Sequence, residues 1–217
     1  MLLELFEKGG WAMWPLLVLL FFGIAVAIER AYSLFKAAID ADKFFTDLES
    51  TLRSSGADKA AEFCSETQGP VASVIHAGLV RLHRGLDHAE KAIENSGAVE
   101  MAFLERGMVW LSTVANLAPM IGFLGTVSGM INAFRKIEEL GDVEPSAVAG
   151  GISEALVTTA SGLVVGIIIQ FCYNFFANKI DRIIADMQEH TAAFVDILAE
   201  MIQEGKIGTG EQVGTGE

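Results

Sequence analysis

The sequence predicts an all-α integral membrane protein with three transmembrane helices. Hydrophobic residues make up 52% of the 217 residues, and the mean hydropathy is +0.42. They gather in three long apolar runs, at residues 11–30, 109–134 and 153–177, whereas a soluble core interleaves apolar with polar residues. Apolar residues also recur at helical spacing between and after these runs. We therefore expect the second and third helices to be long and to extend into the cytoplasm, beside a helical cytoplasmic domain.

The first span is expected over residues 11–30, after a short segment of residues 1–10. Its apolar run is long enough to cross a bilayer with help from its flanks. A cleaved export signal is the alternative, because Ala25-Val26-Ala27 fits a cleavage pattern of small residues. Export signals carry a basic segment before the apolar run, however, and the segment before this run contains the acidic residues Glu4 and Glu7. We therefore favour a retained first span.

Residues 31–108 are expected to form a cytoplasmic helical region. Apolar residues repeat at helical spacing from Leu34 to Leu52, which predicts one helix there. Ser54-Ser55-Gly56 and Gly69-Pro70 are typical helix breaks. A further helix is expected from Val71 to Leu82.

A long continuous helix is predicted from about Asp87 to about Phe134. Asp87 and Glu90 have the spacing of a capping box, which predicts the start of the helix. No stop signal follows, since Gly97 and Gly107 only weaken the helical pattern. Much of this helix is expected to project from the membrane before entering it.

The second span is expected over residues 109–134, within that long helix. Pro119 should kink the helix or loosen one turn. Small residues recur at spacings of three and four: Gly122, Gly125, Gly129 and Ala133. Such a stripe lets two helices approach closely in lipid, and Thr126 lies beside it.

The remainder of the chain is predicted to contain a turn, a span, a helix and a tail. Residues 135–152 read as a polar turn outside the membrane, and residues 153–177 as the third span. This span also has small residues at helical spacing: Ala155, Thr159, Gly162 and Gly166. The pattern continues as a solvated amphipathic helix over residues 178–204. Residues 205–217 have the composition of a flexible tail.

Basic residues near the ends of the spans predict the orientation. Six of them favour one side: Arg30, Lys36, Lys43, Arg106, Lys179 and Arg182. Only Lys8 and the pair Arg135-Lys136 lie on the opposite side. The excess places residues 31–108 and the C-terminus in the cytoplasm, and the N-terminus and the 135–152 turn outside.

Polar side chains of the second and third spans are expected to meet. Counted along two antiparallel helices, Thr126 and Thr159 lie at similar depth in the outer half of the membrane, with Glu154 above them. Thr158 and Ser161 fall near the Glu154 face. The alternative is that each hydroxyl bonds only its own helix and that Glu154 is solvated at the interface. Their combination at one level instead indicates a polar, partly hydrated path.

Charge and composition argue against several function classes. The net charge of −13 repels nucleic acid and anionic lipid surfaces. Cys64 and Cys172 are far apart and predict no disulfide framework, and the four histidines form no ligand cluster, so no metal is expected. We find no nucleophile–base pair or phosphate loop. No catalytic residues, no enzyme activity and no cofactor are therefore expected.

Two of these segments resemble a known family. Ala118–Met130 and Ile152–Leu163 are similar to the signature segments of the MotA/TolQ/ExbB proton-channel family. Trp14-Pro15, followed by an apolar run that ends in Glu29-Arg30, resembles the family's first span. The resemblance covers about residues 10–180, and the layout of three spans is closer to ExbB and TolQ than to MotA, which has four.

The resemblance implies a proton-channel subunit of a motor in the bacterial inner membrane, with a periplasmic N-terminus. Such subunits form a homopentamer around two copies of a single-span ExbD-like or TolR-like partner, and the complex uses the proton motive force to drive a periplasmic TonB-like or TolA-like protein. The family's pore-lining positions fall here on Thr126, Glu154 and Thr159. Secondary pore or packing candidates are Thr158, Ser161, Gly122, Gly125 and Gly129. The alternative is a structural membrane scaffold that does not conduct, and the choice between outer-membrane transport and envelope maintenance stays open.

Overall fold

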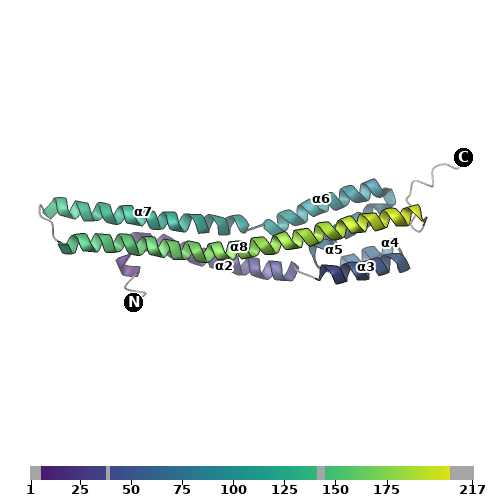
Figure 1. The fold of residues 1–217 in the computed structure, drawn as a ribbon, viewed down its shortest axis with the longest axis horizontal. Coiled ribbons are helices and arrows are strands. Elements are labelled where there is room, and N and C mark those ends of the chain that lie inside the picture. The colour runs from purple at the N-terminus through teal and green to yellow at the C-terminus, as the bar shows by residue number, and fades with distance from the viewer. Residues whose placement is uncertain (1–5, 38–39, 141–144, 206–217) are drawn as a thin grey trace. The chain divides into compact units, whose positions relative to one another are not determined.

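The structure is a computed structural model that describes residues 6–37, 40–140 and 145–205. Its regular elements in these ranges are all helices (Figure 1). After helical residues 6–8, they are in chain order the 3-10 turn η1 (Gly10–Ala12), α2 (Met13–Ala37), α3 (Ala41–Ser55), α4 (Ala57–Glu66), α5 (Pro70–Arg81), η2 (Leu82–Arg84), α6 (Leu86–Glu105), α7 (Met108–Leu140) and α8 (Pro145–Gln203). The all-α prediction is therefore confirmed.

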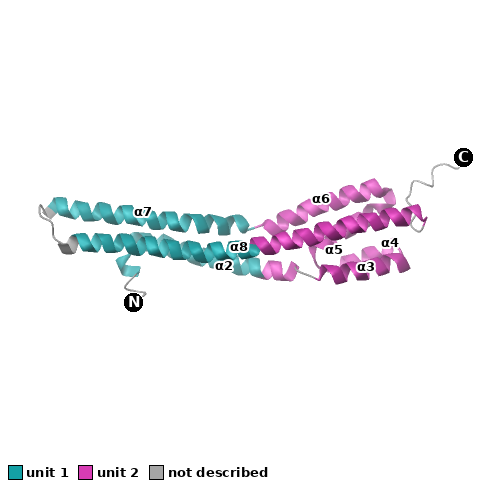
Figure 2. Cartoon of the chain, viewed as in Figure 1, with its two compact units in different colours: residues 1–31, 107–176 teal, residues 32–106, 177–217 magenta. Residues whose placement is uncertain are grey.

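Three helical stretches have the length and composition to cross a membrane. They are Gly10–Ser55, Leu86–Glu139 and Val148–Gln203, which contain the three predicted spans. The chain divides into two compact units, shown in Figure 2. Unit 1 comprises residues 1–31 and 107–176, and unit 2 comprises residues 32–106 and 177–217.

In unit 1, α2 packs against α7 and α8 through a small apolar cluster. Its buried members are Met13, Leu16, Ala118 and Val165. Large apolar side chains cover the outside, where Phe21, Phe123 and Phe171 are 65%, 65% and 73% exposed. Exposed apolar surface on this scale is unfavourable in water but suits a lipid surface or other membrane subunits.

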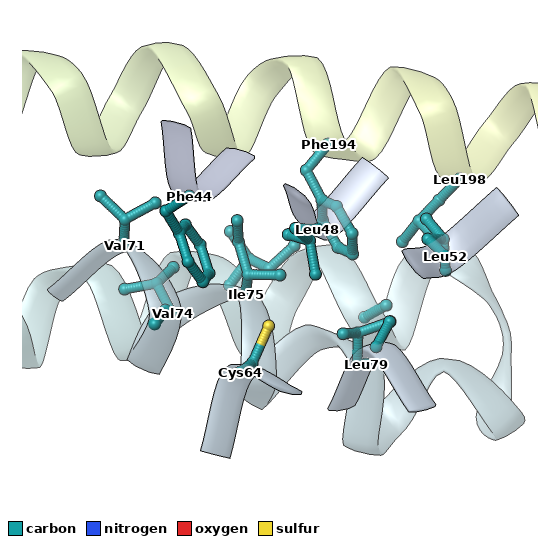
Figure 3. Close-up of a cluster of buried hydrophobic side chains, with 14 of the residues drawn as sticks. Phe44, Leu48, Leu52, Cys64, Val71, Val74, Ile75, Leu79, Phe194 and Leu198 are labelled. Carbon is teal, nitrogen blue, oxygen red and sulfur yellow. The ribbon is translucent and has the colours of Figure 1, made fainter. Parts of the chain in front are cut away.

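Unit 2 has a compact hydrophobic core. Side chains of α3, α4 and α5 meet those of α6 and of the C-terminal part of α8. Figure 3 shows Phe194 and Leu198 of α8 reaching toward Leu48, Leu52 and Ile75. The periodicity of residues 178–204 therefore reflects burial of one helix face in this core.

Two helices are divided differently from the prediction. The prediction of one helix from Leu34 to Leu52 is wrong, because α2 ends at Ala37 and α3 begins at Ala41. Asp40 starts α3 by accepting a hydrogen bond from the backbone N–H of Lys43 at 3.2 Å, an N-cap that the periodicity alone does not reveal. The breaks at Gly56 and Gly69 are confirmed, with φ of 83° and 135°. Between them lies α4, which the sequence analysis did not separate.

The prediction of one continuous helix from Asp87 to Phe134 is also wrong. α6 ends at Glu105 and α7 begins at Met108. Arg106 is extended, with ψ of 130°, and Gly107 has φ of 86°, a left-handed conformation that glycine adopts without a steric penalty. The capping box is wrong as well, since Gly85 precedes the first helical residue and no side chain caps α6.

The segment predicted as an outer turn is largely helical. α7 continues to Leu140, and α8 begins at Pro145, a residue well suited to the first turn. α7 also runs through Pro119 without interruption. The predicted flexible tail lies almost wholly outside the described residues, and the sides of the membrane assigned to residues 1–10 and 135–152 stay predictions.

Candidate functional site

Helices α7 and α8 touch through their backbones. A Cβ placed on Gly122 would lie 2.9 Å from the carbonyl oxygen of Thr158, and one on Gly162 would lie 2.6 Å from that of Ala118. A Cβ on Gly129 would likewise lie 3.0 Å from the carbonyl oxygen of Gly151. The small-residue stripes of both spans are thus confirmed as the packing surface of this helix pair.

Thr126 of α7 and Thr159 of α8 meet at this surface, and their hydroxyls are hydrogen-bonded to each other. Thr126 Oγ1 also donates to the carbonyl oxygen of Ala155 at 3.1 Å, and Thr159 Oγ1 to that of Gly122 at 3.2 Å. Both side chains are half-buried. The prediction that the two threonines lie at one level is confirmed.

The threonine pair offers more acceptors than hydrogens. Each hydroxyl carries one hydrogen and can accept as well as donate. The carbonyl oxygens of Ala155 and Gly122 and the partner hydroxyl are alternative acceptors within reach. Several bonding patterns of similar geometry are therefore available, which is the property that a proton relay requires.

Of the two secondary hydroxyl candidates, Thr158 packs between the helices, and the assignment of both to a pore stays a prediction. Thr158 is fully buried and donates to the carbonyl oxygens of Glu154 and Ala155 in its own helix, at 3.0 and 2.9 Å. Its side chain fills the space beside Gly125, where a Cβ would lie 2.7 Å away. Ser161 is half-buried and does not join the threonine pair.

Glu154 lies inside α8 and is half-buried, with its carboxylate against Gly10 of η1. It borders a polar cavity of about 430 Å³ whose other lining residues include Lys8, Asn132, Lys136 and Ser153. Glu154 precedes Thr159 by five residues, about 7.5 Å of helix, so it does not itself join the hydroxyl pair. The carboxylate is placed in a polar pocket rather than among apolar side chains.

The sequence analysis missed several polar side chains of this unit. The Trp11 indole donates to Ser128 Oγ at 3.0 Å and so attaches η1 to α7. Farther along the helices, Gln170 Nε2 donates to Asn174 Oδ1 at 2.9 Å, and Asn116 is exposed on α7. The sequence signal that could have identified Gln170, Asn174 and Asn116 is an amide side chain inside an apolar run, because lipid offers an amide no hydrogen-bond partner.

Arg30, one of the basic residues used to predict the orientation, is not a solvated side chain in the structure. It is buried beside Gly107, and its Nε and Nη2 atoms bond the Glu29 carboxylate at 2.7 and 2.6 Å. Among the described residues, no group of three or more His, Cys, Asp or Glu side chains has the arrangement of a metal site.

Comparison with known proteins is informative over most of the chain. Residues 66–189, which include Thr126, Glu154 and Thr159, match the model of the MotA/TolQ/ExbB proton channel family. A putative biopolymer transport protein ExbB homolog of Methanothermobacter thermautotrophicus is 32% identical over 82% of this chain and 64% of its own length. A putative ExbB-like protein 1 of Synechocystis is 32% identical over 86% of this chain and 72% of its own. The biopolymer transport protein ExbB of Neisseria gonorrhoeae is 45% identical over 38% of each chain. The chain thus spans just under two thirds of the archaeal relative.

Proposed function

Because the chain belongs to the MotA/TolQ/ExbB proton channel family, we propose that it is the proton-channel subunit of an inner-membrane motor. In this proposal it has no enzymatic activity, and copies of it assemble into a homopentamer. The N-terminus and the α7–α8 connection face the periplasm, and unit 2 lies in the cytoplasm. The excess of basic residues on the unit 2 side supports this orientation.

The observation that carries the proposal is the contact between Thr126 and Thr159. Two hydroxyls from different helices share carbonyl acceptors at one level of a membrane-length helix pair. Polar groups at that depth are costly unless they face protein or water. The polar cavity at Glu154 supports an entry from the periplasmic side, and Gln170 and Asn174 extend the polar series along α8.

The pathway needs a carboxylate that can carry protons, and we propose that a partner supplies it. Within the three apolar runs, Glu154 is the only carboxylate apart from the flanking Glu29. An ExbD-like or TolR-like single-span subunit with an aspartate in its span fits this requirement. One charge that crosses 100 mV releases about 2.3 kcal/mol, so a few protons supply enough energy to shift a helix interface and drive a TonB-like or TolA-like protein.

A scaffold that does not conduct is the second candidate. Its support is that Thr126 and Thr159 each bond backbone carbonyls and thereby join α7 to α8. A scaffold requires these bonds for assembly, whereas a channel requires their hydrogens for transport. Replacement of both threonines by valine keeps the side-chain shape and removes the hydroxyls. It should therefore impair assembly of a scaffold but impair proton transport by a channel.

The test is proton flux through the complex purified by a tag on this chain and reconstituted in liposomes. We expect the double variant Thr126→Val with Thr159→Val, and separately Glu154→Gln, to lower the flux at least about tenfold while the oligomer stays intact. Thr113→Val is the matched control, because within the described ranges Thr113 on α7 bonds only the Val109 carbonyl of its own helix.

Flux is followed with an internal pH dye after a potassium diffusion potential is imposed, and assembly by size-exclusion chromatography with light scattering. Wild-type flux in both the double variant and Glu154→Gln would defeat the channel proposal. Dissociation of the double variant, with Thr113→Val intact, would favour the scaffold.

A further inference from the structure

Unit 2 has a surface groove that the proposed ion pathway does not use. This α6–α8 groove has a volume of about 560 Å³, within the usual range of binding pockets. Helices α6 and α8 form its two walls. Its apolar lining includes Ile93, Gly97, Met101, Met187 and Val195.

The rim of the α6–α8 groove is acidic. Glu90 and Glu94 line it from α6, and Asp196 lines it from α8, whereas no Lys, Arg or His side chain does. In the described part of the chain none of these three carboxylates belongs to an ion pair. Unpaired negative charge around an apolar lining complements a ligand that is both basic and apolar. The same charge repels nucleic acid and anionic lipid.

The apolar lining of the α6–α8 groove is suited to binding a helix. Met101 and Met187 are flexible, polarisable side chains that adapt to different partners. Gly97 leaves room above it, since an added Cβ would have only the Met187 methyl carbon nearby, at 4.0 Å. An amphipathic helix binds such a groove through apolar anchors spaced by one turn, with its charged residues at the rim.

We propose that the α6–α8 groove binds the basic, amphipathic cytoplasmic flank of a single-span membrane partner. Met187 follows the third predicted span by ten residues of the unbroken helix α8, about 15 Å of helical rise. Membrane proteins concentrate Lys and Arg just inside the membrane, so a partner's flank carries the required charge at this distance. The inference depends on the proposed function only for the cytoplasmic location of unit 2.

The charge requirement is tested on the full chain in phosphatidylcholine nanodiscs. The probe is a fluorescein-labelled helical peptide of roughly 14 Lys and Leu residues, and a Glu/Leu peptide of the same pattern is the negative control. We expect the triple variant Glu90→Gln, Glu94→Gln, Asp196→Asn to weaken Lys/Leu binding at least about tenfold beyond binding to empty nanodiscs.

The matched control neutralises three exposed carboxylates away from the groove, through Asp47→Asn, Asp58→Asn and Glu66→Gln. It should retain wild-type affinity. Gly97→Leu fills the groove without changing charge and should also weaken binding, while circular dichroism shows that unit 2 remains folded. Equal affinity of the two triple variants, or full binding by Gly97→Leu, would overturn the inference.

The identity of the occupant is tested in the native complex. Ala98, an exposed residue of the groove, is replaced by photoreactive p-benzoylphenylalanine, and the cross-linked peptide is sequenced by mass spectrometry. A cross-link to a Lys- and Arg-rich segment next to the span of a single-span protein supports the inference. A cross-link to another copy of this chain or to a soluble protein, or none at all, refutes it. The proposed proton pathway uses Thr126, Thr159 and Glu154 in unit 1, so each proposal can fail without the other.

Discussion

Gly162→Ala should separate α7 from α8 at the threonine pair. The new Cβ would lie 2.6 Å from the carbonyl oxygen of Ala118 and 2.9 Å from Gly122 Cα, both of them backbone atoms that cannot rotate away. Ordinary van der Waals contact requires at least 3.4 Å, so the helices must move apart by about 0.8 Å. The bonds from Thr126 to the Ala155 carbonyl and from Thr159 to the Gly122 carbonyl, at 3.1 and 3.2 Å, would then exceed hydrogen-bonding distance.

The expected cost is a net loss of about 1–3 kcal/mol. Overpacking costs about 1–3 kcal/mol, and each hydrogen bond between membrane helices contributes about 0.6 kcal/mol. Alanine recovers about 1 kcal/mol because its helix propensity exceeds that of glycine. Steric conflict therefore outweighs propensity at Gly162.

The measurement is unfolding in mixed micelles with increasing sodium dodecyl sulfate, followed by tryptophan fluorescence. Gly150→Ala is the matched control, since it makes the same substitution in the same helix with no atom of another segment within 4 Å of the new Cβ. It should be neutral or stabilising by up to about 1 kcal/mol. The reasoning about backbone contact is refuted if Gly162→Ala is as stable as Gly150→Ala.

Three further predictions concern unit 2. Leu48 is fully buried, so Leu48→Ala should lower the free energy of unfolding by about 2–5 kcal/mol in urea titrations, and Val80→Ala, at a half-exposed site, should cost far less. Asp40→Ala should cost about 1 kcal/mol in the same assay and Asp40→Asn almost nothing, because only alanine removes the N-cap of α3. Burial raises the pKa of the Cys64 thiol to about 12 from 9.0, so the native state keeps a proton that the unfolded chain releases. Stability should therefore fall as the pH rises from about 9 toward about 12, and a Cys64→Ala variant whose unfolding midpoint falls equally over that range would contradict this account.

Local patterns were sufficient for the helical class, the three spans and the packing stripes. A run of apolar residues is long enough to cross a bilayer whatever it packs against, and glycines one turn apart share a face of any helix. Counting residues along two antiparallel helices also placed Thr126 and Thr159 at one level. These features depend on spacing within helices and, for the threonines, on the antiparallel order of two successive spans, both of which the sequence contains.

The tertiary structure decided which small residues end a helix and which polar groups meet. Gly97 and Gly107 look alike in the sequence, but only Gly107 takes a positive φ and separates α6 from α7. Thr158 and Thr159 are neighbours, and yet only Thr159 hydrogen-bonds to α7, while Thr158 bonds carbonyls of its own helix and packs against Gly125. Glu154 likewise borders a cavity whose lysines come from distant parts of the chain. Such outcomes depend on contacts between segments far apart in sequence, which no local pattern contains.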